Sequence, residues 1–176
     1  MFAGPNGSGK STLKSHLPPA LLGVYLNPDE MEQQVRRQTC LDFTAYGVRT
    51  TAEAALTFFQ NSQFLNDAGF SETAKQLTFA NQRLEFGAAA MNSYLASVAS
   101  DFLRQELMKQ KISFTLETVM SHRSKIELLT QAQAAGYRTY LYYVATDDPA
   151  INISRVRTRV KLGGASCAGG QDCRTL

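Results

Sequence analysis

Histidine, cysteine and tryptophan are scarce in this sequence: its 176 residues include two histidines, three cysteines and no tryptophan. Because the histidines are only His16 and His122, an HExxH zinc motif is excluded, and a histidine-based metal site or catalytic triad is a poor explanation of any activity. The cysteines, Cys40, Cys167 and Cys173, lack CxxC spacing, so they predict neither a disulfide framework nor a zinc knuckle. Any catalysis must therefore use carboxylates, lysine, arginine and a bound ion.

Strong charge of one sign and long apolar runs are also missing. Eighteen basic and 15 acidic residues leave a net charge of +3, which is too small to indicate a nucleic-acid or membrane partner. No apolar run approaches the ~18 residues that span a bilayer, and the first residues, MFAGP, do not have the pattern of a signal peptide. We therefore expect a soluble, cytoplasmic protein. The length and the 44% of hydrophobic residues predict a single domain over residues 1–176 with a buried core.

Strand-like and helix-like segments alternate along the chain. Short runs typical of strands cover 1–3, 24–26, 112–116 and 140–145, and helical patterns cover 11–17, 30–38, 123–135 and 149–161. This alternation predicts an α/β fold with a parallel sheet covered by helices on both faces. Residues 40–111 contain no convincing strand, and apolar residues at helical spacing from Met91 to Leu107 predict an amphipathic helix. We therefore expect a helical insertion at about 40–111.

Residues Gly4 to Ser11 read GPNGSGKS, which matches the phosphate-loop (Walker A) pattern GxxxxGK[ST] between a strand-like run and a helix. Glycines permit the positive φ angles that turn successive backbone N–H groups toward one anion, so the expected fold is a P-loop NTPase type. We expect Lys10 to reach the β- and γ-phosphates of ATP and the Ser11 hydroxyl to ligate Mg²⁺. The predicted ATP-binding residues are Gly4, Pro5, Asn6, Gly7, Ser8, Gly9, Lys10, Ser11 and Thr12. The alternative interpretation is a flexible glycine turn with an exposed lysine.

The residues after the second predicted strand indicate the class of P-loop protein. The sequence has no NKxD motif of the kind that GTPases use to read their base. Asp29 follows the run 24–26, and ligands of open α/β sheets bind beyond the carboxyl ends of the strands. Small-molecule kinases place a substrate-facing acid there, so we predict that Asp29 accepts the proton of an acceptor hydroxyl. The alternative is structural, because Asp29 and Glu32 have capping-box spacing for the next helix.

Glu117 and Thr118 follow the predicted strand 112–116, so the same rule directs both toward the ligand crevice. An acid at this position would bind Mg²⁺ through water or hold a substrate hydroxyl. The alternative is a solvated glutamate at a strand end. Both histidines, His16 and His122, are expected to have structural roles.

Arg155, Arg157 and Arg159 lie on the last predicted helix, where Arg155 and Arg159 share a face and Arg157 points elsewhere. Phosphoryl transfer spreads negative charge over the phosphate oxygens, and a guanidinium placed over them stabilises that charge. We therefore expect Arg155 first, and Arg159 second, to contribute to catalysis. The alternative is a solvated basic helix face.

Five segments together resemble the zeta-toxin family of P-loop kinases. They are FAGPNGSGKST (2–12), LNPDE (26–30), FTLETVMSH (114–122), GY-x-x-x-LYYVAT (136–146) and DPAINISRVRTRVKLGG (148–164). The resemblance implies ATP·Mg²⁺-dependent phosphorylation of a hydroxyl, which in the toxin members is the 3′-hydroxyl of the sugar in UDP-N-acetylglucosamine. It also implies an antitoxin protein as the partner of a toxic member. The alternatives are an ATP-binding module that has lost transferase activity and acts as a regulatory switch or partner-binding protein, or a kinase for another hydroxyl acceptor.

The resemblance implies the same roles for the residues named above, with Glu117 and Thr118 lining the acceptor site and Arg155 or Arg159 in a lid. After the paired glycines at 163–164 the sequence departs from the family pattern, and two of the three cysteines lie in residues 165–176. We hypothesise that one inserted base in the codons of these glycines shifted the reading frame, which resequencing the gene would test. The tail is expected to be irregular.

Overall fold

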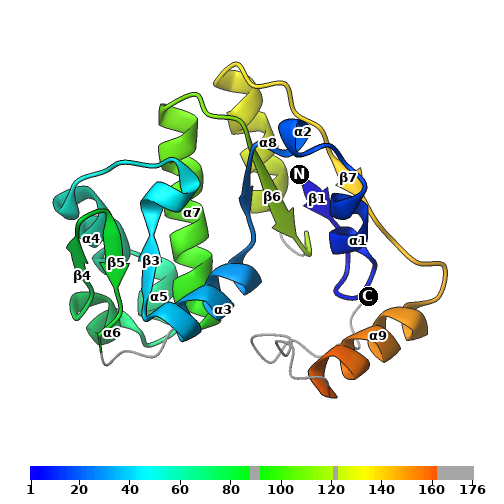
Figure 1. The fold of residues 1–176 in the computed structure, drawn as a ribbon, viewed down its shortest axis with the longest axis horizontal. Helices are drawn as coiled ribbons and strands as arrows, with labels where there is room; N and C mark the ends of the chain where they lie inside the picture. The colour runs from blue at the N-terminus through cyan, green and yellow to red at the C-terminus, as the bar shows by residue number, and fades with distance from the viewer. Residues whose placement is uncertain (88–91, 121–122, 162–176) are drawn as a thin grey trace. The chain divides into compact units, whose positions relative to one another are not determined.

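The computed structural model describes residues 1–87, 92–120 and 123–161, and these residues form two compact units. The first unit combines the two ends of the chain, Met1–Tyr25 and Thr115–Leu176, and the second is the intervening segment Leu26–Phe114 (Figure 1). The insertion expected at about 40–111 lies inside the second unit. The tail at 165–176 and His122 lie outside the described residues.

A four-stranded sheet organises the first unit. Its strands are β1 (Phe2–Ala3), β2 (Val24–Leu26), β6 (Phe114–Thr118) and β7 (Tyr142–Tyr143), in the spatial order β2-β6-β1-β7. Strand β1 runs parallel to both β6 and β7, with Phe2 opposite Glu117 and Tyr142. The predicted α/β architecture with a parallel sheet is therefore confirmed.

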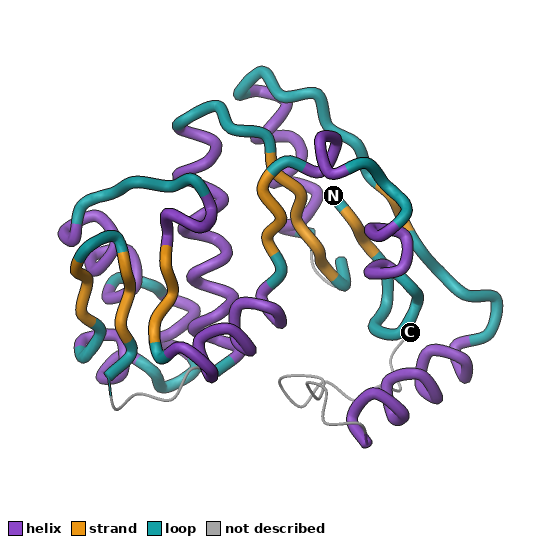
Figure 2. Tube along the Cα trace, viewed as in Figure 1, coloured by secondary structure: helices purple, strands orange, loops and turns teal. Residues whose placement is uncertain are grey.

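The helices of the first unit can be followed in Figure 2. They are α1 (Lys10–Ser15), α2 (Pro19–Leu22), α8 (Ser124–Ala134) and α9 (Pro149–Lys161). The carboxylate of Asp148 accepts a hydrogen bond from the N–H of Ala150 at 2.8 Å, so Asp148 caps α9 and Pro149 occupies its first turn. The short helix α2 was not predicted: prolines that end one helix also favour the first turn of another, and Pro19 occupies that position.

Strand β6 begins at Phe114, two residues later than the alternating pattern predicts. The preceding helix α7 (Ser93–Lys109) ends in a Schellman-type cap, in which Lys111 has a φ of 57°. The N–H of Ile112 donates to the carbonyl of Leu107 at 3.0 Å in this cap. Ile112 therefore belongs to the end of the helix, and the strand includes Glu117 and Thr118 rather than stopping before them.

The second unit contains strands, which corrects the expectation that residues 40–111 hold none. Its elements are α3 (Pro28–Gln38), β3 (Cys40–Asp42), the 3₁₀ helix η1 (Phe43–Tyr46), α4 (Ala52–Gln60), α5 (Gln63–Asp67), α6 (Ser71–Lys75), β4 (Thr78–Ala80), β5 (Arg83–Glu85) and α7. The strands pair antiparallel in the order β3-β5-β4. Each has only three residues, which is too short for a clear alternating pattern. The turn between β4 and β5 places Asn81 and Gln82 at φ values of 51° and 62°, as a tight hairpin requires.

Helix α7 supplies much of the core of the second unit, as its predicted amphipathic pattern requires. The Asn92 side chain accepts from the N–H of Leu95 at 2.9 Å and caps the helix start. The Phe102 ring packs against Phe43 and Phe58, with centroid separations of 5.5 Å and 5.1 Å. Over the ranges that the structure describes, no helix has the length and apolar character needed to cross a membrane.

Candidate functional site: the phosphate loop and the ends of β2 and β6

The phosphate loop connects β1 to α1 and has the backbone conformation that the motif predicts. Gly4, Gly7 and Gly9 have φ values of +141°, +82° and +103°, which side-chain-bearing residues rarely adopt. The N–H of Gly4 donates to the carbonyl of Thr118 at 3.3 Å, which ties the loop to the end of β6. The carbonyl of Gly9 accepts from Leu13 at 3.0 Å and starts the helix.

Two of these glycines also lie against other parts of the first unit. A Cβ atom on Gly4 would lie 2.0 Å from the carbonyl oxygen of Val144, and one on Gly7 would lie 2.5 Å from the carbonyl oxygen of Asn152. Both distances are shorter than any van der Waals contact. The loop therefore needs glycine at these positions for space as well as for φ.

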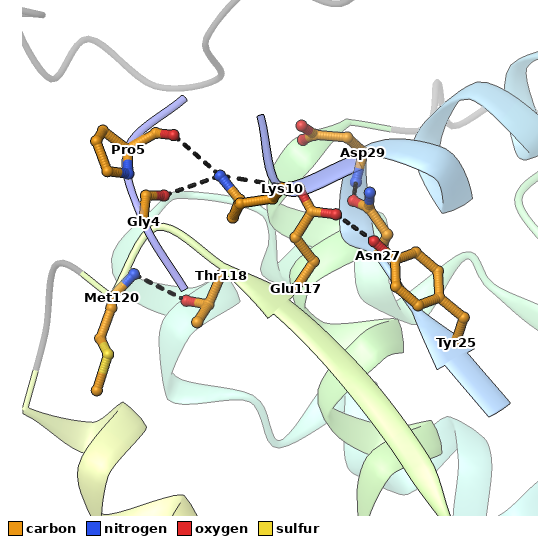
Figure 3. Close-up of polar contacts among 9 residues, drawn as sticks. All are labelled: Gly4, Pro5, Lys10, Tyr25, Asn27, Asp29, Glu117, Thr118 and Met120. Carbon is orange, nitrogen blue, oxygen red and sulfur yellow. Dashed lines mark hydrogen bonds and ion pairs between the residues drawn. The ribbon is translucent and has the colours of Figure 1, made fainter. Parts of the chain in front are cut away.

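Lys10 is buried inside the loop that it follows. Its ammonium donates to the carbonyl oxygens of Gly4 at 2.8 Å and Pro5 at 3.1 Å, and lies 3.8 Å from Oε1 of Glu117 (Figure 3). The residue is only 5% exposed, and a buried ammonium is tolerated when oxygen atoms surround it. The alternative of a flexible turn with an exposed lysine is therefore wrong.

Glu117 lies at the end of β6, opposite Phe2 of the neighbouring strand, and so faces the start of the phosphate loop. Its Oε1 atom faces Lys10, and its Oε2 atom accepts a hydrogen bond from the hydroxyl of Tyr25 on β2 (Figure 3). The ammonium of Lys14 lies 3.4 Å from the centroid of the Tyr25 ring, a cation–π contact. The alternative of a solvated strand-end glutamate is contradicted, since the Glu117 side chain is 14% exposed and paired.

Tyr25 and Lys14 were missed by the sequence reasoning. The position of Tyr25 one strand away from Glu117 depends on the order of strands in the sheet, and β2 and β6 are separated by almost ninety residues of sequence. An aromatic residue in a short strand is ordinarily explained by packing alone. The one signal in the sequence is that Tyr25 immediately precedes the segment 26–30, which contains the predicted general base Asp29.

Thr118 supports the backbone at this end of β6. Its carbonyl accepts from Gly4, and its side-chain oxygen accepts from the N–H of Met120 at 3.1 Å. Ser11 and Thr12, the last predicted nucleotide-binding residues, are exposed at the start of α1. His16 contacts the carbonyl of Thr12 through Nδ1 at 2.8 Å, in keeping with the structural role predicted for it.

Asp29 belongs to the second unit, in the first turn of α3, and is exposed. The capping-box alternative for this residue is wrong, because the helix cap is Asn27, whose Oδ1 accepts from the N–H of Asp29 at 3.0 Å. Glu32 instead pairs with Arg36 one turn along the helix, at 2.6 Å. The structure brings Lys10 and Glu117 together within the first unit, and Asp29 is described with the second.

Helix α9 contacts the phosphate loop directly. The Nη1 atom of Arg155 donates to the carbonyl oxygen of Gly7 at 3.2 Å, so this guanidinium lies beside the loop. Asn152, one turn earlier on the same face, is 8% exposed. Arg157 is exposed, and the side chain of Arg159 lies outside the described part of the structure.

Comparison with known proteins agrees with the resemblance in the motifs. The zeta toxin family model matches residues 89–171, a range that includes β6, Glu117 and α9. This match covers just under half of the chain, which is similar to the zeta toxin family over that range. A protein of Haemophilus influenzae (strain Rd) called "Uncharacterized protein" is 35% identical over 57 residues, which are 32% of this chain and 41% of that relative. No solved structure matches the chain significantly.

Two buried polar atoms beside the phosphate loop have no hydrogen-bond partner among the residues that are described. They are the hydroxyl of Ser8 and Oδ1 of Asn152, on residues that are 5% and 8% exposed. An unpaired buried polar group costs about 1–3 kcal/mol. Asn152 is also the only buried residue among the side chains of α9 that the structure describes, whereas Ile151 and Val160 of the same helix are 42% exposed. This face of α9 is therefore shaped for contact with the polar loop rather than with an apolar core.

Proposed function

We propose that this protein is a kinase that transfers the γ-phosphate of ATP to a hydroxyl group of a small molecule, as its similarity to the zeta toxin family over residues 89–171 suggests. The observation that carries the proposal is the buried Lys10 ammonium, held by phosphate-loop carbonyls beside the Glu117 carboxylate at the end of the adjacent parallel strand. A glycine-rich loop that contains a cation binds phosphate, and an acidic side chain at the end of the adjacent strand is suited to bind an acceptor.

The residues present fit a nucleotide and Mg²⁺. When bound, ATP supplies the phosphoryl group and Mg²⁺ offsets the charge of its oxygens. Lys10 would hold the β- and γ-phosphates, the exposed Ser11 hydroxyl would ligate Mg²⁺, and Arg155 would donate to phosphate from the other side of Gly7. In the described ranges, no group of three or more His, Cys, Asp and Glu side chains could hold a metal ion.

Asp29 is our candidate for the general base, and Glu117 and Thr118 are our candidates for binding the acceptor. Two observations support a chemical role for Asp29: it is exposed in the segment that follows β2, and helix capping does not account for it. A carboxylate in this role takes the proton of the acceptor hydroxyl as the hydroxyl oxygen attacks phosphorus. The family resemblance favours the sugar of UDP-N-acetylglucosamine as the acceptor, and an antitoxin as the partner if the chain is toxic.

The test is incubation of the full chain with ATP·Mg²⁺ and a panel of UDP-sugars, followed by mass spectrometry of the small molecules. We expect one added phosphoryl group on UDP-N-acetylglucosamine, and none with Lys10→Ala. Asp29→Asn should bind ATP within about twofold of the parent by calorimetry and lose at least ~100-fold in transfer rate, since general-base catalysis is worth about 10²–10⁴.

Other outcomes would lead to other conclusions. ATP binding without transfer to any UDP-sugar would exclude the sugar-nucleotide acceptor and favour another acceptor or a binding module. No heat with ATP would overturn the proposal as a whole.

A further inference from the structure

The Glu117 carboxylate contacts two neighbouring side chains, those of Tyr25 and Lys10. Its Oε2 atom receives the hydroxyl proton of Tyr25, and its Oε1 atom faces the ammonium of Lys10 at 3.8 Å. Both side chains of the ion pair are well covered, with exposures of 5% for Lys10 and 14% for Glu117. Charges with so little solvent around them interact more strongly than a surface pair.

Lys10 cannot interact at full strength with Glu117 and with a bound triphosphate at the same time. The phosphates of a bound nucleotide carry more negative charge than one carboxylate, so Lys10 must turn at least part of its hydrogen bonding toward them. The strength of its attraction to Glu117 therefore opposes phosphate binding.

Tyr25 is placed to control this exchange. It lies on β2, the strand next to β6 in the sheet, and its ring is held under the ammonium of Lys14 at 3.4 Å. A hydroxyl donor on Oε2 stabilises the carboxylate without using Lys10. Without that donor, more of the negative charge of Glu117 would act on the ammonium of Lys10, and the ion pair would be stronger.

We propose that Tyr25 is a positioning residue that acts through Glu117: it weakens the hold of Glu117 on Lys10 and keeps the carboxylate in place when Lys10 moves to phosphate. The inference rests on the proposed function only in that the phosphate loop binds a triphosphate.

The experiment measures ATP affinity by calorimetry, so it requires no acceptor and no turnover. Glu117→Gln should tighten ATP binding at least threefold, because Lys10 loses a charged competitor. General charge repulsion would produce the same sign, so the substitution is repeated in a Lys10→Met background. If the effect acts through Lys10, Glu117→Gln should not tighten ATP binding in the Lys10→Met background. An equal increase in ATP affinity in both backgrounds would overturn the proposal.

Tyr25→Phe removes only the hydroxyl and should weaken ATP binding about threefold or more. Tyr143→Phe is the matched control, because it removes a hydroxyl from a residue on β7 that is 61% exposed, and it should change nothing. In the Glu117→Gln background, Tyr25→Phe should have no further effect. A loss of ATP affinity of the same size in both backgrounds would show that Tyr25 supports the fold and not Glu117, and would overturn the proposal.

This test is independent of the proposed kinase function. If ATP binds but no acceptor is phosphorylated, the kinase function fails, while the affinities of the single and double variants still decide the role of Tyr25.

Discussion

Replacing Gly7 by alanine tests whether the contact between the phosphate loop and α9 matters for nucleotide binding. The added Cβ atom would lie 2.5 Å from the carbonyl oxygen and 3.1 Å from the Cα atom of Asn152, both of them backbone atoms of a helix. A φ of +82° adds a conformational cost of about 1–2 kcal/mol for a side-chain-bearing residue. Overpacking against backbone adds about 1–3 kcal/mol. The cheapest relief is for α9 to move away, which breaks the hydrogen bond between Arg155 and Gly7.

Gly9→Ala is the matched control for this prediction. Gly9 has a φ of +103°, but a Cβ atom there would meet nothing within 4 Å, so this variant carries the conformational cost without the clash. In calorimetric titrations with ATP·Mg²⁺, we expect Gly7→Ala to bind about 5- to 150-fold more weakly than Gly9→Ala, which corresponds to the overpacking cost alone. Equal affinities of the two variants would refute the reasoning that α9 must pack on the loop.

Two further predictions concern an arginine of α9 and a tyrosine of the second unit. Arg155→Ala should weaken ATP binding roughly fivefold through loss of a hydrogen bond worth about 1 kcal/mol, while Arg157→Ala, on the same helix and also exposed, should leave the calorimetric affinity unchanged. Burial, and to a smaller degree the Glu30 carboxylate, raises the pKa of Tyr46 to about 12. The neutral phenol therefore contributes stability that is complete below about pH 10 and is lost as the pH rises toward 12. Urea unfolding should show that Tyr46→Phe loses less stability than the parent over that interval, and parallel losses would contradict the assignment.

Much of the fold was predictable because its signals are local. The glycines of the phosphate loop act on the backbone within a few residues and have the predicted positive φ angles, and the cap at Asp148 and the glycine after α8 are equally local. The parallel α/β architecture followed from the alternation of such segments. The strands of the second unit were not predictable, because three residues carry too little pattern and are stabilised by pairing with distant segments.

By itself, the amino-acid sequence determined which chemical groups this protein has for phosphate: a glycine loop, Lys10, Ser11 and a set of acids that follow strands. Only the tertiary structure decided that Lys10 is buried beside Glu117, that Tyr25 holds the other oxygen of that carboxylate, and that α9 packs on Gly7. The physical reason is that a motif constrains the backbone of consecutive residues, whereas the neighbours of a side chain depend on the order in which strands pair and on the face that a helix buries.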